Sequence, residues 1–204
     1  VEKRRRSLAL FDELGKAGTS AAASGQFRLG VLLHRKEDLE GAEGAFRRAI
    51  DIFVANESEG VTLAQARVQL GRVLTALERP DEAAVEIERG WKSLLPIAEW
   101  NRFDTAIAGL AWGRSLISQD RNEEALSVLR AGLAHAEGIR RVNLEAARYA
   151  VQLSAHAALA LVNLKREPEA IAYLKGGRGA EGAIGDWIDK TLHELTGDAG
   201  SETS

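Results

Sequence analysis

The residue types best suited to acid–base or metal chemistry in this sequence are four histidines, and their spacing does not bring them together. His34, His135, His156 and His193 contain no pair at positions i and i+4, the spacing that places two metal ligands on one face of a helix. The segment after His193 begins like a zinc-protease motif but has no second histidine. Cysteine is absent, which excludes disulfides and thiolate ligands. We therefore expect no bound metal.

A glycine-rich string between Gly177 and Gly182 could suggest a nucleotide site. It reads Gly-Arg-Gly-Ala-Glu-Gly, the spacing of dinucleotide-binding loops, but such a loop needs a preceding strand within a βαβ unit. A helical pattern precedes it here, so we interpret the string as a break between two helices and expect no cofactor. No nucleophile elbow and no Walker lysine loop occur. The sequence thus predicts a non-enzyme, with a site assembled from dispersed residues as the open alternative.

Two further features could act on larger partners. Residues 3–6 form the basic run Lys-Arg-Arg-Arg, and tryptophans stand at positions 91, 100, 112 and 187. The formal net charge is −3, whereas nucleic-acid binding calls for a strongly basic face. No apolar run approaches the ~20 residues needed to cross a bilayer. We expect neither a nucleic-acid nor a membrane partner, and we interpret Trp112 and Trp187 as packing residues.

The beginning of the sequence bears on location and completeness. No apolar segment follows the basic run, so no signal peptide is predicted and a cytoplasmic location is expected. Met is absent, even at position 1. We favour the interpretation that the chain is the C-terminal part of a longer array, with an N-terminal cap over the first residues as the alternative.

The composition is that of a helical protein with an internal repeat. Hydrophobic residues make up 45% and charged residues 28%, with only 3 prolines. Ala, Leu, Glu and Arg, which recur throughout, are good helix formers, so we expect an all-α fold. Four ten-residue windows align without gaps, each running from Leu through a polar turn to Ala: 33–42 (LHRKEDLEGA), 74–83 (LTALERPDEA), 116–125 (LISQDRNEEA) and 161–170 (LVNLKREPEA).

Small and large residues flank every window at constant distances. A small residue precedes each Leu by three positions: Gly30, Gly71, Gly113 and Ala158. A large apolar residue follows each Ala by four: Phe46, Ile87, Leu129 and Leu174. A second small residue comes three positions later: Ala49, Gly90, Gly132 and Gly177. Small residues let two helices approach and large ones fill the space beside them. The pattern therefore predicts four helical hairpins with close crossings.

This pattern, over roughly residues 19–177, resembles the tetratricopeptide repeat (TPR) family. The pairs Leu29-Gly30, Leu70-Gly71 and Trp112-Gly113 fit its signature, and Ala157-Ala158 departs from it. The repeats are longer than the archetypal ~34 residues, as in arrays of bacterial STAND-type regulators and kinesin light chains. The resemblance implies an α-solenoid, or superhelix, that serves as a protein- or peptide-binding scaffold or sensor. One setting that it suggests is the C-terminal array of a larger bacterial regulator.

The periodicity also predicts where the helices begin and end. The first (A) helices of the hairpins are expected at about 19–35, 61–78, 102–118 and 142–164, and the second (B) helices at about 39–56, 81–95, 122–137 and 168–176. Four repeats then occupy about 18–58, 59–99, 100–140 and 141–178, after a B-helix remnant or cap at 1–17. An apolar stripe including Trp187 and Ile188 predicts a C-terminal capping helix over 179–196. Residues 197–204 are expected to form a disordered tail.

The resemblance also implies where a ligand binds. In that family the ligand lies in a concave groove lined by A-helix residues that do not face their own B helix. Carried over, the groove consists of Phe27, Val31, His34, Gln65, Val68, Arg72, Thr75, Leu110, Arg114, Ile117, Gln152 and Asn163. This set contains no acidic residue, so the expected partner is a protein or peptide segment with acidic and apolar residues interleaved. An enclosed pocket for a small molecule or signalling peptide is the alternative.

Two arginines are the most informative members of this set. Arg72 and Arg114 occupy the same position in adjacent repeats, and adjacent helices would bring them to roughly 10 Å. Together they could hold one carboxylate or phosphate. The alternatives are that each arginine pairs with an acidic residue of the chain itself, and that apolar members of the set pack between repeats. Self-association through the ends of the array also stays open.

Overall fold

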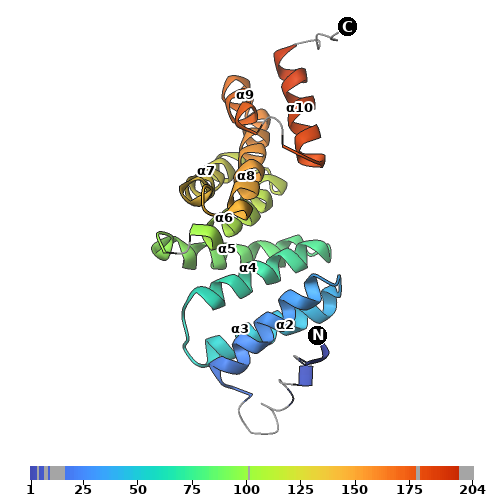
Figure 1. Cartoon of the computed structure of the whole chain (residues 1–204), viewed down its shortest axis with the longest axis vertical. Coiled ribbons are helices and arrows are strands. Elements are labelled where there is room, and N and C mark those ends of the chain that lie inside the picture. The colour runs from blue at the N-terminus through green and yellow to red at the C-terminus, as the bar shows by residue number, and fades with distance from the viewer. Residues whose placement is uncertain (4, 7–8, 10–16, 101, 178–179, 198–204) are drawn as a thin grey trace. The chain divides into compact units, whose positions relative to one another are not determined.

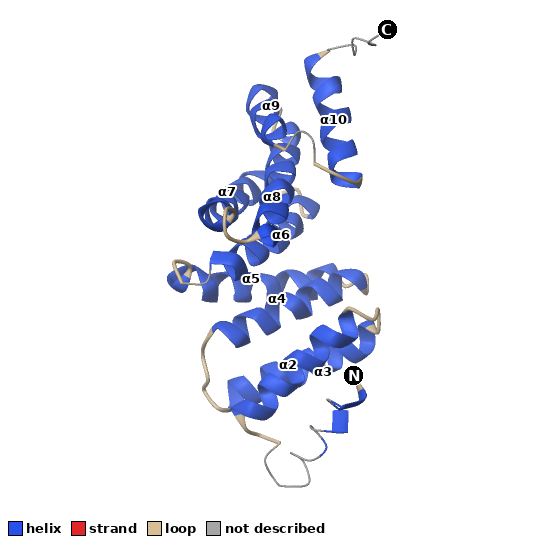
Figure 2. Ribbon diagram, in the orientation of Figure 1, coloured by secondary structure: helices blue, strands red, loops and turns tan. Residues whose placement is uncertain are grey.

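The computed structural model describes all residues except 4, 7–8, 10–16, 101, 178–179 and 198–204. The described residues form helices and connecting loops, and none of them lies in a strand (Figures 1 and 2). The chain divides into two compact units, residues 1–101 and 102–204. Each unit contains two helical hairpins, so the all-α expectation is confirmed.

The first unit contains the first two repeats. Its A helices are α2 (Ser20–His34) and α4 (Val61–Ala76), and its B helices are α3 (Leu39–Ala55) and α5 (Pro80–Leu94), followed by the short 3₁₀ helix η1 (Leu95–Ile97). Each A helix packs on its own B helix, α4 also packs on α3, and α2 and α4 touch. As expected, Pro80 opens a helix, where its missing N–H costs nothing, and Pro96 follows the end of α5.

The second unit contains the last two repeats and a terminal helix. Its A helices are α6 (Arg102–Ser118) and α8 (Leu144–Asn163), its B helices are α7 (Asn122–Ile139) and α9 (Glu167–Gly176), and α10 (Ala183–Thr196) follows. Here α8 packs on α6, α7 and α9, and α10 contacts α9 and α8. The eight repeat helices begin and end within two residues of the predicted positions, because hydrophobic periodicity and local breakers set these boundaries.

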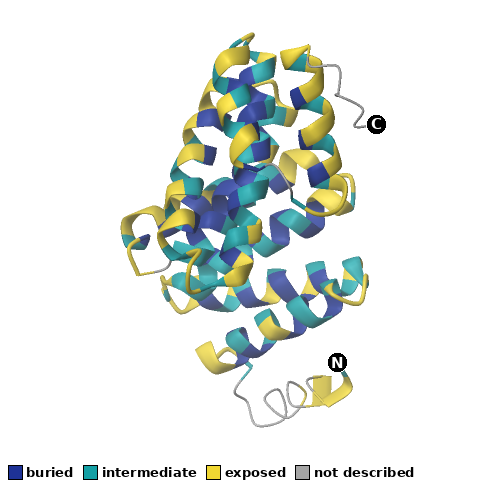
Figure 3. Ribbon diagram, turned by 45° about the horizontal axis from the view of Figure 1, so that its top comes forward, coloured by how far each residue is buried: buried dark blue, intermediate teal, exposed yellow. Residues whose placement is uncertain are grey.

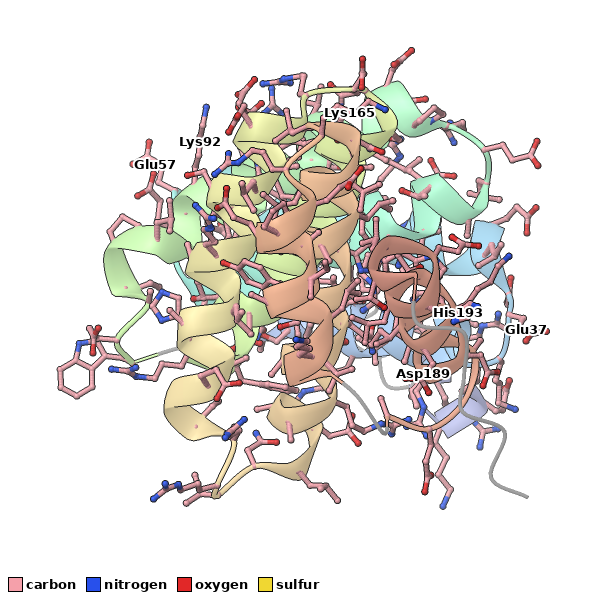
Figure 4. The ribbon with its side chains drawn as sticks, turned by 90° about the horizontal axis from the view of Figure 1, so that it is seen from above. Glu37, Glu57, Lys92, Lys165, Asp189 and His193 are labelled. Carbon is pink, nitrogen blue, oxygen red and sulfur yellow. The ribbon has the colours of Figure 1, made fainter. Side chains whose placement is uncertain are left out.

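The turn inside each hairpin has one repeated backbone geometry. The fifth residue of each ten-residue window is left-handed, with φ between 58° and 62°: Glu37, Glu78, Asp120 and Lys165. The next N–H donates to the carbonyl of the window's first Leu, as in Arg79 to Leu74 at 2.9 Å. This is the Schellman pattern that closes a helix C-terminus. Figure 4 shows Glu37 and Lys165 at the outer edge of their turns.

The core of each unit lies where the helices cross. Buried residues occupy the helix sides that face another helix, and exposed residues cover the outer sides (Figure 3). A Cβ built on Gly71 would clash with Ile87, and one built on Gly113 would clash with Leu129. The predicted small residue of each A helix therefore receives the predicted large residue of its B helix. Ala158 and Leu174, the corresponding pair of the last repeat, are both fully buried.

The B helices of each unit are linked by an equivalent charged bridge. In the first unit Arg47 of α3 bonds Glu82 of α5 at 3.1 Å, and Arg79 holds the same carboxylate. In the second unit Arg130 of α7 bonds Glu169 of α9 at 3.2 Å, and Arg166 holds that carboxylate. The bonds from Arg79 lower the pKa of Glu82 below its usual value. Charged side chains on this face thus neutralise one another.

The ends of the chain were also assigned from the sequence. The predicted remnant at 1–17 falls largely on residues outside the described part, as does the predicted tail, of which only Gly197 is described. Helix α10 begins within four residues of the predicted cap and turns its buried residues, Ile188 and Leu192, toward the last hairpin. Gly177 lies so close to Ile188 that a Cβ there would be 2.8 Å from Ile188 Cδ1. A capping role for α10 remains a prediction.

Candidate functional site

The A-helix surface is narrower than the sequence predicted, because two of the expected groove residues are buried. Val68 is 2% exposed and Leu110 is 5% exposed, so neither can meet a ligand. Val68 packs against Gly90 of α5, on the side of α4 assigned to packing. The error has a physical reason: α4 touches α2, α3 and α5, and α6 touches α7 and α8, so each buries more of its circumference than a single hairpin requires. Assigning Val68 and Leu110 to the groove was wrong.

Phe27 also serves the core. Its ring lies 5.9 Å from the ring of Phe46, centroid to centroid. It packs on a buried cluster that contains Ala23, Ala49 and Phe53. The side chain is partly buried in this way, and its position faces its own B helix, contrary to the prediction. Phe27 is therefore a packing residue at the edge of the groove.

The remaining A-face residues of the first unit are half-buried or exposed: Val31, His34, Gln65, Arg72 and Thr75. Arg72 Nη1 donates to Gln69 Oε1 at 3.2 Å, and Thr75 Oγ1 donates to the carbonyl of Gly71 at 3.0 Å. His34 of α2 lies within electrostatic range of Arg72 of α4. Burial lowers the pKa of His34 below its usual value, and the Arg72 charge lowers it further. The neutral imidazole and the guanidinium form one polar patch across two A helices.

The second unit has a corresponding pair that the sequence did not reveal. Arg114 of α6 is exposed and lies within electrostatic range of His156 of α8. Burial lowers the pKa of His156, a hydrogen bond to the Gln152 carbonyl opposes this, and the Arg114 charge lowers it again. His156 Nδ1 is 2.8 Å from that carbonyl oxygen, so the neutral ring donates through Nδ1 and keeps Nε2 as an acceptor. His156 was not among the predicted groove residues.

The other predicted residues of the second unit divide between two places. Ile117 and Gln152 are half-buried on the A helices, and Gln152 supplies the carbonyl that orients His156. Asn163 Nδ2 donates to Asn122 Oδ1 at 2.9 Å, and Asn122 is a buried residue of α7. Asn163 therefore ties the end of α8 to the beginning of α7.

Neither groove arginine is neutralised within the described part of the chain. The ion pairs found there do not include Arg72 or Arg114, whereas Arg47, Arg79 and Arg166 each contact carboxylates. The alternative in which each groove arginine pairs with an acid of its own chain therefore finds no support here. The two arginines belong to different units, so the ~10 Å separation remains a prediction.

A cavity of about 190 Å³ opens between α8 and α10. Ala155, His156 and Leu159 form one wall, and Ile184 and Trp187 form the other. All of these except Ala155 are half-buried. The labelled residues Asp189 and His193 of α10 (Figure 4) are exposed and do not line the cavity. The apolar stripe of α10 was read from the sequence as packing alone, and only the placement of the helix shows that part of it borders a cavity.

The motifs that could indicate other chemistry find no structural counterpart in the described residues. No three His, Asp or Glu side chains there gather into a group able to hold a metal ion. The described part of the glycine string lies between α9 and α10 without any strand, and Gly182 has φ 74°. No helix among the described residues is both long enough and apolar enough to cross a membrane.

Comparisons with known proteins agree with this architecture. No family model matches the chain, and no curated protein matches it. TPR-like repeats of a kinesin light chain from Podosopora anserina, described as nearly identical repeats, superpose with TM-score 0.68 at 14% identity, covering 89% of this chain and 90% of that chain; a variant of the same protein gives 0.69 at 14%, covering 88% and 89%. YrrB, a TPR protein with an unusual peptide-binding site, superposes with TM-score 0.57 at 20% identity, covering 97% of this chain and 80% of that one. The chain is an all-α helical-repeat protein with the fold of the tetratricopeptide-like solenoids.

Proposed function

We propose that this chain is a scaffold or sensor module that binds a protein or peptide segment along the A-helix faces of its repeats. The observation that carries the proposal is the contrast between the two helix faces. On the B helices, arginines such as Arg47 and Arg130 are held by carboxylates of the next repeat. On the A helices, Arg72 and Arg114 have no carboxylate partner among the described residues. An arginine without an intramolecular acid is available to a carboxylate of a partner.

The neighbours of these arginines indicate what else the partner carries. Val31 and Ile117 are half-buried, so each offers apolar surface that a partner could cover. No acidic residue occurs in the predicted set. The partner therefore carries acidic and apolar side chains interleaved. The peptide-binding site described for YrrB, which shares the fold, supports this class of partner.

A receptor for a free small molecule is the second candidate, and the size of the cavity argues against it. Pockets for drug-sized ligands measure about 300–1,000 Å³. The cavity beside His156 has about 190 Å³, which suits one side chain of a larger partner better than a whole ligand of that size. We propose no catalytic role, because the polar A-face residues include no nucleophile paired with a base.

Peptide display on the intact protein tests the proposal. Selected peptides are titrated by calorimetry against the parent, Arg72→Ala, Arg114→Ala and the double variant. Loss of one charge-assisted contact weakens binding by about 1.5–3 kcal/mol, which is roughly ten- to 150-fold. Arg48→Ala is the matched control, because Arg48 is exposed on α3 and forms no ion pair in the described part of the chain. Peptides that bind all variants equally, or a display that selects no acidic apolar peptide, would reject the groove.

A further inference from the structure

The cavity between α8 and α10 has the composition of a subsite for one apolar side chain. Leu159 and Ile184 give it aliphatic walls from both helices, and Trp187 gives it an aromatic wall. A cavity of about 150 Å³ in another protein suffices to bind benzene. This cavity, at about 190 Å³, therefore has room for a phenyl or leucine side chain.

Its rim carries polar groups that no other described residue uses. The Trp187 indole N–H has no hydrogen-bond partner among the described residues. His156 Nδ1 is engaged with the Gln152 carbonyl, and Nε2 has no partner in the same part of the chain. Arg114, on the adjacent A helix, lies within electrostatic range of His156 and forms no ion pair there. A cation and a free donor beside an apolar cavity complement an anion that adjoins an apolar group.

We propose that this cavity receives a bulky apolar side chain of an internal partner segment, Phe or Leu, whose neighbouring acidic residue is bound by Arg114. The assignment rests on the proposed function, and it adds a defined subsite in which α10 takes part. Helix α10 then forms one wall of a specificity pocket in addition to covering the last hairpin. Charge complementarity selects the acidic neighbour, and the cavity volume selects a single side chain.

Short blocked peptides separate the two requirements. The probe is acetyl-Gly-Glu-Phe-Glu-Gly-amide, and the controls replace Phe by Ala or both Glu by Gln. Binding is followed through the four tryptophan indole N–H signals of the whole chain, with Trp187 assigned from Trp187→Phe. We expect the probe to shift the Trp187 signal saturably and each control peptide to bind about tenfold more weakly, a change of about 1.4 kcal/mol. Equal binding of the Ala or Gln peptide would overturn the proposal.

Variants locate the site on the protein. Leu159→Phe or Ile184→Phe fills the cavity and should abolish the Trp187 shift, and two variants on different helices guard against misfolding of one. Arg114→Gln should equalise the Glu and Gln peptides, whereas Arg148→Gln should not, since Arg148 is exposed on α8 and pairs with Glu145. An unchanged response in both filling variants would overturn the proposal.

The remaining outcomes distinguish this subsite from the wider proposal. No saturable shift with the Phe-containing probe would overturn the subsite, while the groove is judged separately by peptide display and the Arg72 variant. Phenylacetate binding as tightly as the probe would also overturn it, because the cavity would then be a small-molecule site.

Discussion

The ring of Phe46 lies against the backbone of Gly30, so that a Cβ on Gly30 would be 2.7 Å from Phe46 Cδ1. Real Cβ atoms do not approach so closely. The contact joins the A helix and the B helix of the first repeat, and Gly71 with Ile87 and Gly113 with Leu129 repeat it. The interhelix distance in each of these hairpins is thus set by the absence of one methyl group.

Adding that methyl group should destabilise the fold. Gly30→Ala forces the Phe46 ring to move, and overpacking of this kind costs about 1–3 kcal/mol. Gly44→Ala is the matched control, because Gly44 is exposed in α3 and its Cβ would meet nothing within 4 Å. It should stabilise the protein by about 0.5–1 kcal/mol through helix propensity. Urea unfolding measures both, and a Gly30→Ala variant as stable as the parent would disprove the close crossing.

The left-handed turn residues offer a route to higher stability. A left-handed backbone costs an L-residue about 1–2 kcal/mol, and a glycine loses an additional 0.5–1 kcal/mol or so of unfolded-chain entropy. Lys165→Gly should therefore raise the free energy of unfolding by up to about 1 kcal/mol, and Lys165→Val should lower it. Arg48→Gly, in the interior of α3, should instead cost about 1 kcal/mol. Thermal melts that rank Lys165→Val above Lys165→Gly would contradict the turn geometry.

Acidification should weaken the fold through His34 and His156. Both have a pKa below 6.5 in the folded state, first because of burial, so the unfolded chain binds protons more tightly. Their contribution is present above pH 6.5 and declines as the pH falls from 6.5 to the lowered folded-state pKa. The measurement is the free energy of unfolding in urea from about pH 7.5 to about pH 5, a window that spans this decline. His156→Gln should flatten the decline, and an identical pH profile in that variant would exclude His156 as a cause.

Removal of residues 180–204 should expose the apolar side of the last hairpin. Gly177 and the outer face of α8 would lose Ile188 and Trp187, and an uncovered repeat end tends to self-associate. We expect a lower melting temperature and larger species in sedimentation velocity. Removal of residues 198–204 alone is the control and should leave both quantities unchanged. A truncated chain that stays monomeric and melts like the parent would show that α10 is not a cap.

The sequence determined the helices, their order and the residues at their crossings. These properties depend on local rules: an apolar period of 3.6 residues, prolines tolerated only at helix starts, and polar turns of constant length. The spacing of Gly30 and Phe46 relative to the Leu33–Ala42 window could therefore be read without coordinates. The left-handed residue at the fifth window position was not predicted, because Glu, Asp and Lys are not residues that signal this conformation as glycine does.

The tertiary structure decided which A-helix residues reach the surface. Val68 and Arg114 were both assigned to the groove, yet Val68 is buried and Arg114 is exposed, because burial depends on every helix that packs nearby. The cavity of His156 and Trp187 brings together residues about thirty positions apart, and its existence depends on how closely α10 lies on α8. Helix periodicity specifies the face that a residue occupies, but only non-local packing determines whether that face is covered.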